Sequence, residues 1–552
     1  MTASYRKILE KVRLAFPRPV SDRVHDSYFV HSIMRALDQV DAMKSEIPLL
    51  GGPVSMDYAA ARRSELSEPM ASIEEVTSAL VSYLEGMPIF GHPRQQTNVI
   101  AQPSIPSLIG VLLSALYNAN LAWDEHSRRI ALAEVEVSAI LARLLGYPPD
   151  QAAGVFTFGG TGTTLYGVKI GLEKACPGSM DQGVPEDVAL FASDASHYSR
   201  SSVAGWLGIG IKRVITIPTR PDNGIDLDRL EQEARKALQA GRKIAAFIAT
   251  LGTTDAFGLD DLHGMVALRD RLVNDFRLPY SPHVHADAVI GWAWSVFTEY
   301  DFEQNPLGFR PRTVHALAGI CRPIRHLHLA DSIGVDFHKT GFAPYISSLV
   351  LVKNSQDLSL LSRTSEQMPY LYQFGEYRPG MFTLECSRPG TGVLAALANL
   401  RLLGKEGARA ALGHIVEMAQ LLREHLEGHE SITVLNRENL GPVTLFRVYP
   451  EEADTFALRE REFKDSAFRE TLRSYNEYNR RVFAYVHEEA VAGRGVMLSL
   501  TECYRHTAYG EPIVALKSFI LSPFVDEDDV RTVVEKVLEA REHLAHNRSA
   551  PT

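Results

Sequence analysis

The sequence has few cysteines, and no two of them are close enough to suggest a disulfide framework. The four lie far apart and form no CxxC pair: Cys176, Cys321, Cys386 and Cys503. No apolar run approaches the roughly 20 residues that a membrane span needs, and the N-terminus lacks the apolar core of a secretory signal. The net charge is −10 with scattered basic residues, which argues against nucleic acid as a partner. We therefore expect a cytoplasmic protein.

Three segments differ in their sequence patterns. Residues 1–90 predict amphipathic helices between GGP and GMP breakers, and so an N-terminal helical arm. In residues 91–404 short β-rich runs alternate with helical patterns, which favours an α/β domain with a mostly parallel sheet and helices on both faces. Residues 405–552 predict a smaller α+β domain, and the apolar stretch 104–123 predicts a buried helix. Ligands of such sheets bind at the carboxyl ends of the strands.

Two stretches with glycine and threonine follow predicted strands. GGTGTTLYG, residues 159–167, opens a helix after the run GVFTF. Glycines allow close approach of the backbone, and the free N–H groups of a helix N-terminus attract an anion, so this is either a phosphate cradle or an ordinary glycine-rich turn. It is neither a Walker loop nor a GxGxxG dinucleotide motif. TLGTTDAFG, residues 250–258, places Thr253 and Thr254 at another strand end.

The stretch HVHADAV places His283, His285 and Asp287 at alternate positions of a predicted strand. Their side chains then share one face, as zinc ligands would, but a strand end that holds an organic cofactor has the same spacing. A zinc hydrolase needs further converging ligands, and it would leave Lys339 and the glycine-rich turn without a role. We therefore expect no metal.

Lys339 follows Asp336 and His338 and precedes small and apolar residues. Such surroundings favour a lowered pKa and Schiff-base chemistry, although an ordinary surface lysine is the alternative. With the cradle and Asp287, Lys339 completes what pyridoxal phosphate requires: an aldehyde anchor, an anion site and a partner for the ring nitrogen. His197, just after the run VALFAS, could stack on the ring.

The order of these motifs resembles the group II pyridoxal-phosphate decarboxylases, which include glutamate and aromatic amino-acid decarboxylases, within the fold-type I aminotransferase superfamily. The resemblance runs through GHP, FGGTGTTLYG, DASHYS, TLGTTDAFG, HADA, DFHK and TLECSRPG, over roughly residues 90–400. It implies a mostly parallel seven-stranded sheet flanked by helices, a helical N-terminal arm and a smaller α+β C-terminal domain. It also implies a carboxy-lyase that releases carbon dioxide from an L-amino acid.

The resemblance also implies the roles of individual residues. Lys339 would form the Schiff base with the cofactor, and Asp287 would pair with the pyridinium nitrogen and keep it protonated. His197 would stack on the ring. The remaining cofactor contacts would come from Gly162, Thr163 and His338 at the phosphate, and from Thr253 or Thr254 beside the ring.

In the resembling enzymes a tyrosine on a mobile loop returns a proton to Cα. EQMPYLYQFGEYRPG offers Tyr370, Tyr372 and Tyr377, and the distance from CSR favours Tyr372. A second stretch, residues 300–330, looks like an insertion, either a lid or a surface elaboration.

Substrate recognition is less well defined by the motifs. A substrate carboxylate requires a cation, for which Arg388 and Lys517 are candidates. Lys517 falls where glutamate decarboxylases carry an arginine, and a lysine lacks the bidentate fork. Asn98 matches a polar position that binds the substrate side chain. Acidic substrates are slightly favoured, with aromatic and branched aliphatic ones open.

One alternative uses the same cofactor. The lysine segment also resembles that of sphingosine-phosphate lyases, which cleave an aldol bond, but those carry Lys-Gly where this chain has Tyr345 and Ile346. Fold-type I enzymes generally build each active site at a dimer interface. We therefore expect a homodimer, with residues 1–90 as a clasp between subunits.

Overall fold

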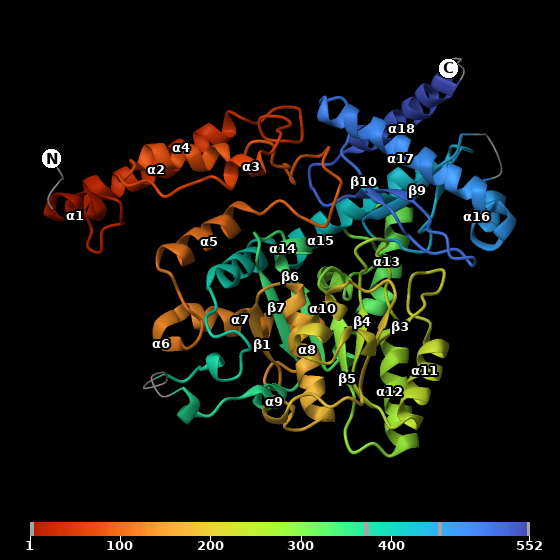
Figure 1. Cartoon of the computed structure of the whole chain (residues 1–552), viewed down its shortest axis with the longest axis horizontal. Helices are drawn as coiled ribbons and strands as arrows, with labels where there is room; N and C mark the ends of the chain where they lie inside the picture. Colours follow the sequence, from red (N-terminus) through yellow and green to blue (C-terminus); the bar gives the residue numbers. More distant parts are fainter. Residues whose placement is uncertain (1–4, 369–374, 451–454, 549–552) are drawn as a thin grey trace.

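A seven-stranded sheet forms the centre of the fold (Figure 1). The computed structural model describes residues 5–368, 375–450 and 455–548. The strands lie in the order β1-β7-β6-β5-β4-β2-β3. Their bounds are β1 (Ala153–Thr157), β2 (Val188–Ser193), β3 (Val214–Ile217), β4 (Lys243–Thr250), β5 (His283–Asp287), β6 (Ser332–Asp336) and β7 (Ser348–Val352). Only β7 runs against its neighbours, so the predicted mostly parallel sheet is confirmed.

Helices cover both faces of this sheet. They are α6 (Asp124–Ser127), α7 (Arg129–Leu145), α8 (Gly160–Ala175), α9 (Ser179–Gln182), α10 (Ser199–Trp206), α11 (Leu227–Gln239), α12 (Leu262–Phe276), α13 (Pro311–Ile324) and α14 (Phe337–Thr340). Successive residues of a strand point to opposite faces. In β2, Leu190 packs in the core with α8 and α10, whereas Phe191 packs in the core with α11 and α12. Burial on both faces explains the nearly continuous apolar runs of these strands.

The strand β6 was missed by the sequence patterns. Its residues, SIGVD, form a short run with polar ends and an internal glycine, which gives a weak strand signal. In the structure all five are buried, because β6 pairs with β5 on one side and with β7 on the other. Pairing with distant segments therefore decides this strand.

Helix α8 lies unusually close to the sheet because it carries two glycines on its inner face. A Cβ atom at Gly167 would collide with the ring of His285, and one at Gly171 would collide with the carbonyl oxygen of Ala245. This close packing fixes the N-terminus of α8 beside the carboxyl ends of the central strands.

The N-terminal segment is helical, as predicted, and extends beyond the body of the molecule (Figure 1). Its helices are α1 (Tyr5–Leu14), α2 (Arg23–Asp41), α3 (Tyr58–Ala61) and α4 (Ile73–Ser82), and none of them contains a buried residue. The next helix, α5 (Ile105–Leu116), packs on α15 (Thr391–Glu427). Within one chain this apolar helix is buried on its inner face only, because Leu108, Ile109 and Leu113 remain about half exposed on its outer face.

The C-terminal segment contains an antiparallel four-stranded sheet in the order β10-β11-β9-β8. Its strands are β8 (Ile432–Val434), β9 (Val443–Val448), β10 (Ser499–Thr501) and β11 (Ala515–Phe519), and its helices are α16 (Thr455–Lys464), α17 (Arg469–Val491) and α18 (Glu527–Arg548). Helix α15 crosses the predicted boundary at residue 404, where Gly404 breaks the helix with φ +53°. The division at residues 90 and 404 stays a prediction.

Residues 300–330 belong to the packed body of the chain. They contain α13, which contacts α15 and the 3-10 helix η2 (Gly291–Phe297). Leu317 and Ile320 are buried in this contact, which favours the surface elaboration over the lid. In the described part of the chain no helix is both long and apolar enough to cross a membrane.

Candidate active site

A cavity of about 230 Å³ opens where the carboxyl ends of β4, β5 and β6 meet the N-terminus of α8. Its wall contains six residues predicted from the sequence, which lie far apart in the chain: His197, Thr253, Thr254, Asp287, His338 and Lys339. Parallel strands bring them together, because their carboxyl ends lie at one edge of the sheet. No residue of the stretch 300–330 lines this cavity.

The ammonium group of Lys339 is paired with a carboxylate that the sequence motifs did not assign a role. Lys339 Nζ lies 2.8 Å from Asp336 Oδ2, and the Ser348 hydroxyl donates a 2.5 Å hydrogen bond to Asp336 Oδ1. Burial lowers the pKa of Lys339, but Asp336 and then Asp287 outweigh this effect and raise it above its usual value. The expected lowered pKa of Lys339 is therefore wrong for the cofactor-free chain. The available signal was the position of Asp336 three residues before the lysine.

Asp287 is the last residue of β5 and is buried beside Lys339. Its backbone is in register with Thr250 of β4 and Gly334 of β6. Its Oδ1 atom has no hydrogen-bond partner among the residues that the structure describes. Burial raises the pKa of Asp287 to about 6, although Lys339 acts in the opposite direction. A buried carboxylate oxygen without a partner is suited to a protonated ring nitrogen.

The two histidines of β5 are held by one hydroxyl group. Ser332 Oγ lies 2.8 Å from His283 Nε2 and 2.8 Å from His285 Nδ1. Burial lowers the pKa of His285 to about 3, and the nearby His283 adds to this shift. In the described ranges no three His, Cys, Asp or Glu side chains are grouped so that they could hold a metal ion. The histidines therefore serve the packing beneath Asp287.

The glycine-rich turn contributes its backbone to the cavity. Gly159 has φ +118°, a conformation that favours glycine, and Gly160 and Thr161 line the cavity with it. The two residues predicted to bind phosphate have side-chain positions turned inward: a Cβ atom at Gly162 would lie 2.5 Å from Thr157 Oγ1, and the Thr163 hydroxyl donates to the Gly160 carbonyl. The first N–H groups of α8 lack acceptors within the helix, so they can bind an anion.

His197 and Tyr345 form two sides of the cavity. His197 Nδ1 accepts a 3.2 Å hydrogen bond from the Ser199 N–H group. Burial lowers the pKa of His197, and the charge of Lys339 lowers it further, which favours a neutral ring that can stack on a flat ligand. Tyr345, which was not predicted as a site residue, packs against His338 with ring centroids 4.0 Å apart and ring planes tilted by 44°.

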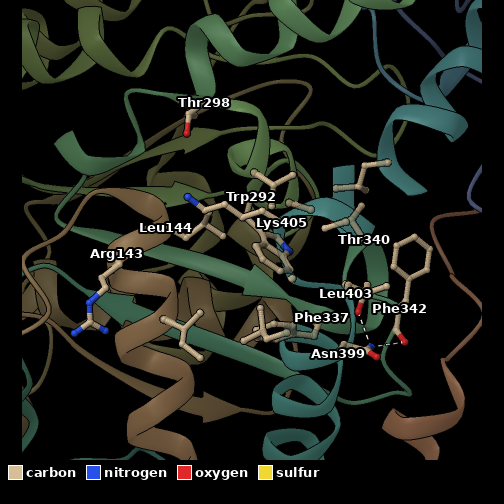
Figure 2. Close-up of a pocket in the computed structure, with 18 of the residues that line it drawn as sticks. Arg143, Leu144, Trp292, Thr298, Phe337, Thr340, Phe342, Asn399, Leu403 and Lys405 are labelled. Atoms are coloured by element: carbon tan, nitrogen blue, oxygen red, sulfur yellow. Dashed lines mark hydrogen bonds between the residues drawn. The ribbon is translucent and has the colours of Figure 1, made fainter. Parts of the chain in front are cut away.

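The segment after Lys339 is fixed from behind by α15. Asn399 donates 2.7 Å hydrogen bonds to the carbonyl oxygens of Gly341 and Phe342, and Figure 2 shows this amide beside Phe342. A separate, mostly apolar cavity of about 430 Å³ lies here, lined in part by Trp292 and Phe337. It has no part of the predicted site in its wall.

The structure does not bring Arg388 to the cavity. The side chain is buried, and its guanidinium lies 2.5 Å from Glu134 Oε1 and donates to the carbonyl oxygens of Phe156 and Leu121. Glu134 in turn accepts a 2.9 Å hydrogen bond from the Tyr377 hydroxyl. These contacts give Arg388 a structural role in place of the predicted contact with a substrate carboxylate.

The hydrogen bond between Tyr377 and Glu134 affects one of the three tyrosines considered as proton donors. Burial, together with Glu134, raises the pKa of Tyr377 well above its usual value, so this hydroxyl is committed to packing. Tyr370 and Tyr372 lie outside the described residues, and the role of Tyr372 stays a prediction.

Neither Lys517 nor Asn98 is part of the cavity wall. Lys517 Nζ is 2.8 Å from Asp255 Oδ1, and Asp255 directly follows Thr254 of the cavity. Asn98 is exposed, and its side-chain oxygen accepts a hydrogen bond from the Val99 N–H group. Their predicted contacts with substrate stay predictions.

Comparison with known proteins identifies the group of enzymes. Residues 65–303 and 313–448, more than half of the chain, match the family described as the pyridoxal-dependent decarboxylase conserved domain. The chain belongs to this family. It is therefore a pyridoxal-phosphate-dependent amino-acid decarboxylase, and the carboxy-lyase interpretation is confirmed over the aldol-type lyase and the zinc hydrolase.

Relatives of this decarboxylase act on different amino acids, according to their names. L-2,4-diaminobutyrate decarboxylase of Acinetobacter baumannii is 26% identical over 471 residues, which are 82% of this chain and 81% of the relative. Aspartate 1-decarboxylase of Aliivibrio fischeri is 25% identical and aligns with 63% of this chain and 64% of its own length. The family therefore fixes the reaction type without fixing the substrate.

Solved structures show the same fold. The glutamate decarboxylase domain of a Vibrio parahaemolyticus protein, titled diaminobutyrate-pyruvate transaminase and L-2,4-diaminobutyrate decarboxylase, gives a TM-score of 0.73 at 18% identity, covering 97% of this chain and 99% of that one. Oryza sativa TDC with PLP and tryptamine gives 0.74 at 17% identity, covering 96% and 100%. The fold-type I architecture of this decarboxylase is thereby confirmed.

The cavity of the decarboxylase fits its cofactor on three observations. The free oxygen of Asp287 suits the ring nitrogen, the N-terminus of α8 suits the phosphate, and Lys339 lines the same cavity as an aldehyde anchor. No single one of these groups is specific, but together they match the three ends of pyridoxal phosphate.

Asp287→Asn should stabilise the cofactor-free decarboxylase in a pH-dependent manner. Because the folded pKa of Asp287 is raised to about 6, its ionisation destabilises the fold above the unfolded pKa near 4, and fully above pH 6. The variant should unfold with a free energy about 3 kcal/mol higher at pH 8, and this gain should shrink as the pH falls toward 4. Denaturant titrations between pH 5 and 8 measure it. The exposed control Glu438→Gln should show no such trend, and a gain independent of pH would contradict the assignment.

Proposed function

We propose that this decarboxylase converts an L-amino acid to its amine and carbon dioxide in the cavity that contains Lys339 and Asp287. The observation that carries the proposal is the Oδ1 atom of Asp287, which has no hydrogen-bond partner among the described residues and is buried next to Lys339 in the wall of the cavity. A carboxylate in this state is a site for a cationic ring nitrogen. The proposal assigns it that role.

Bound pyridoxal phosphate supplies an electron sink for the bond that breaks. Asp287 holds a proton on the ring nitrogen, because an adjacent carboxylate favours the charged form of that nitrogen. Lys339 provides the amine that holds the cofactor covalently, and the neutral ring of His197 stacks on it. The N–H groups at the start of α8 bind the phosphate, next to Gly160 and Thr161.

The other residues predicted from the sequence have supporting roles in this proposal. The Thr253 hydroxyl accepts a 2.8 Å hydrogen bond from Gly258 N–H and so shapes the turn, whereas Thr254 is half-buried and faces the cavity. His338 supports the site by packing against the ring of Tyr345. Tyr372 is our candidate for the return of a proton to Cα.

The substrate in this proposal carries a charged side chain. Lys517 can bind an acidic side chain, as the sequence favoured, when it moves away from Asp255. A second class is supported by the same pair: Lys517 is 10% exposed and Asp255 is 45% exposed, so the carboxylate is the accessible member. An accessible carboxylate recognises an amino group, as in L-2,4-diaminobutyrate.

We propose further that two copies form a homodimer through α5 and the N-terminal arm. The outer face of α5 exposes Leu108, Ile109, Leu112 and Leu113, and the four arm helices bury none of their residues within one chain. A contiguous exposed apolar face of this kind is typical of an interaction surface. A second copy of the chain is the occupant that the expected clasp requires.

Changing Lys339 tests the cofactor anchor. The purified wild-type protein should be yellow, and Lys339→Ala should lose the visible absorption of the Schiff base. Borohydride reduction followed by peptide mass spectrometry should place the cofactor on Lys339 in the wild type and in the exposed control Lys236→Ala. A label on another residue, or a colourless zinc-containing preparation, would refute the proposal.

Carbon dioxide release from glutamate, aspartate, 2,4-diaminobutyrate and tyrosine tests the substrate class. Removal of a hydrogen bond to a charged group costs about 1.5–3 kcal/mol, which is about a 10- to 100-fold loss of kcat/KM. Lys517→Met should cause this loss for acidic substrates, and Asp255→Asn should cause it for diaminobutyrate. If both variants lower kcat/KM equally for all four substrates, Lys517 and Asp255 do not select the substrate.

Charges placed on the outer face of α5 test the dimer. The double variant Leu112→Glu with Leu113→Glu should sediment as a monomer, because it buries two carboxylates in the proposed interface. Phe524→Glu, which changes an exposed residue outside α5, should remain dimeric. An active wild-type protein that sediments as a monomer would rule out this assembly.

A further inference from the structure

Lys339 is paired with a carboxylate that the sequence motifs did not point to. Two aspartates face Lys339, yet the ion pair joins Lys339 Nζ to Asp336 Oδ2 at 2.8 Å, and Asp287 keeps an oxygen without a partner. The side chain of Asp336 is 0% exposed and that of Lys339 is 16% exposed. A buried carboxylate requires a compensating charge, so this pairing is a defined state of the site.

The carboxylate of Asp336 is fixed from several sides. Asp336 is in register with Ser348 of β7, whose hydroxyl holds Oδ1. The other oxygen lies 3.5 Å from His338 Nε2, and a Cβ atom at Gly160 would lie 2.9 Å from it. Asp336 therefore stands against the N-terminus of α8, where the proposed phosphate site begins.

We propose that Asp336 is a positioning residue that holds Lys339 as an ammonium group in the cofactor-free enzyme and accepts its proton when the cofactor attaches. This inference rests on the proposed function, because it takes Lys339 as the anchor. It adds a step that precedes catalysis, namely the loading of the enzyme.

The proton balance of loading follows from the pair. Lys339 gives one proton to Asp336 Oδ2, which leaves a neutral amine and a neutral carboxylic acid. The amine nitrogen attacks the aldehyde carbon of pyridoxal phosphate, and its two remaining protons leave with the aldehyde oxygen as one water molecule. The product is a carbon–nitrogen double bond, and no oxidant or reductant is needed.

The transferred proton also removes an electrostatic conflict. An ionised Asp336 beside Gly160 would repel a phosphate group at the N-terminus of α8, whereas a neutral acid can donate a hydrogen bond to it. One proton transfer therefore frees the nucleophile and prepares the anion site.

Other groups face Lys339, but Asp336 is the one that contacts its ammonium group directly. Burial lowers the pKa of His338 and the pKa of His197, which weakens both rings as bases. Asp287 acts on Lys339 less strongly than Asp336 does, and Tyr345 is a phenol whose pKa burial raises. Asp336 is the group that already contacts the ammonium.

The reactivity of Lys339 toward trace acetic anhydride in the cofactor-free protein tests the proposal. Peptide mass spectrometry gives the labelling rate at each pH, and hence the pH midpoint of Lys339. An opposite charge this close shifts a pKa by about 1 to 3 units, so Asp336→Asn should lower the midpoint by about one pH unit or more and raise labelling at pH 8 about tenfold. The pH dependence of cofactor loading, measured by the rise in visible absorption, should shift to lower pH in parallel. An unchanged midpoint in a folded Asp336→Asn protein overturns the proposal.

Two further measurements separate charge from packing. Ser348→Ala removes the hydroxyl that holds Asp336 but keeps the carboxylate, so the high midpoint of Lys339 should remain. If Asp336→Asn fails to fold, the wild type still tests the proposal. A labelling midpoint of Lys339 below that of the exposed Lys236 overturns it. Borohydride trapping separates failure of the proposed function from failure of this proposal. A cofactor that is not attached to Lys339 refutes the proposed function, whereas the labelling midpoint still reports the ion pair of Lys339 and Asp336.

Discussion

The alignment of the carboxyl ends of three parallel strands is the constraint on which the site depends. Thr250, Asp287 and Gly334 are neighbours in register, and Asp336 follows two residues further along β6. Chain segments separated by tens of residues thereby place two carboxylates and one lysine within a cavity of about 230 Å³. The close packing of α8 at Gly167 and Gly171 adds a helix N-terminus to the same edge.

The charged and polar groups that suit the cofactor line one cavity. Asp287, the start of α8 and Lys339 are all part of its wall, and Lys339 is paired there with Asp336. The two imidazoles that face Lys339, His197 and His338, are kept neutral by burial. A ligand with a cationic ring nitrogen, an aldehyde and a phosphate meets a matching group at each position. This complementarity gives a physical reason for the cofactor that the family match identifies.

The two cations considered for substrate binding show how similar residues serve different purposes. Arg388 is enclosed with Glu134 and holds the strand β1 and the segment around Tyr377 in place. Lys517 lies on β11 of the second sheet and meets Asp255 of the first domain. The first pair stabilises the fold, and the second lies next to Thr254 of the cavity wall.

The sequence by itself determined the fold class, most strands of the central sheet and, through its motifs, the candidate site residues His197, Asp287 and Lys339. These are encoded locally, because a strand is a short apolar run and each motif is a short stretch of neighbouring residues. Tertiary structure alone decided the strand β6, the exposure of α5, the burial of Arg388 and the pairing of Lys339 with Asp336. Each depends on a contact with a distant segment, and a local pattern cannot tell whether an apolar face packs on its own chain or whether a cation already has a buried partner.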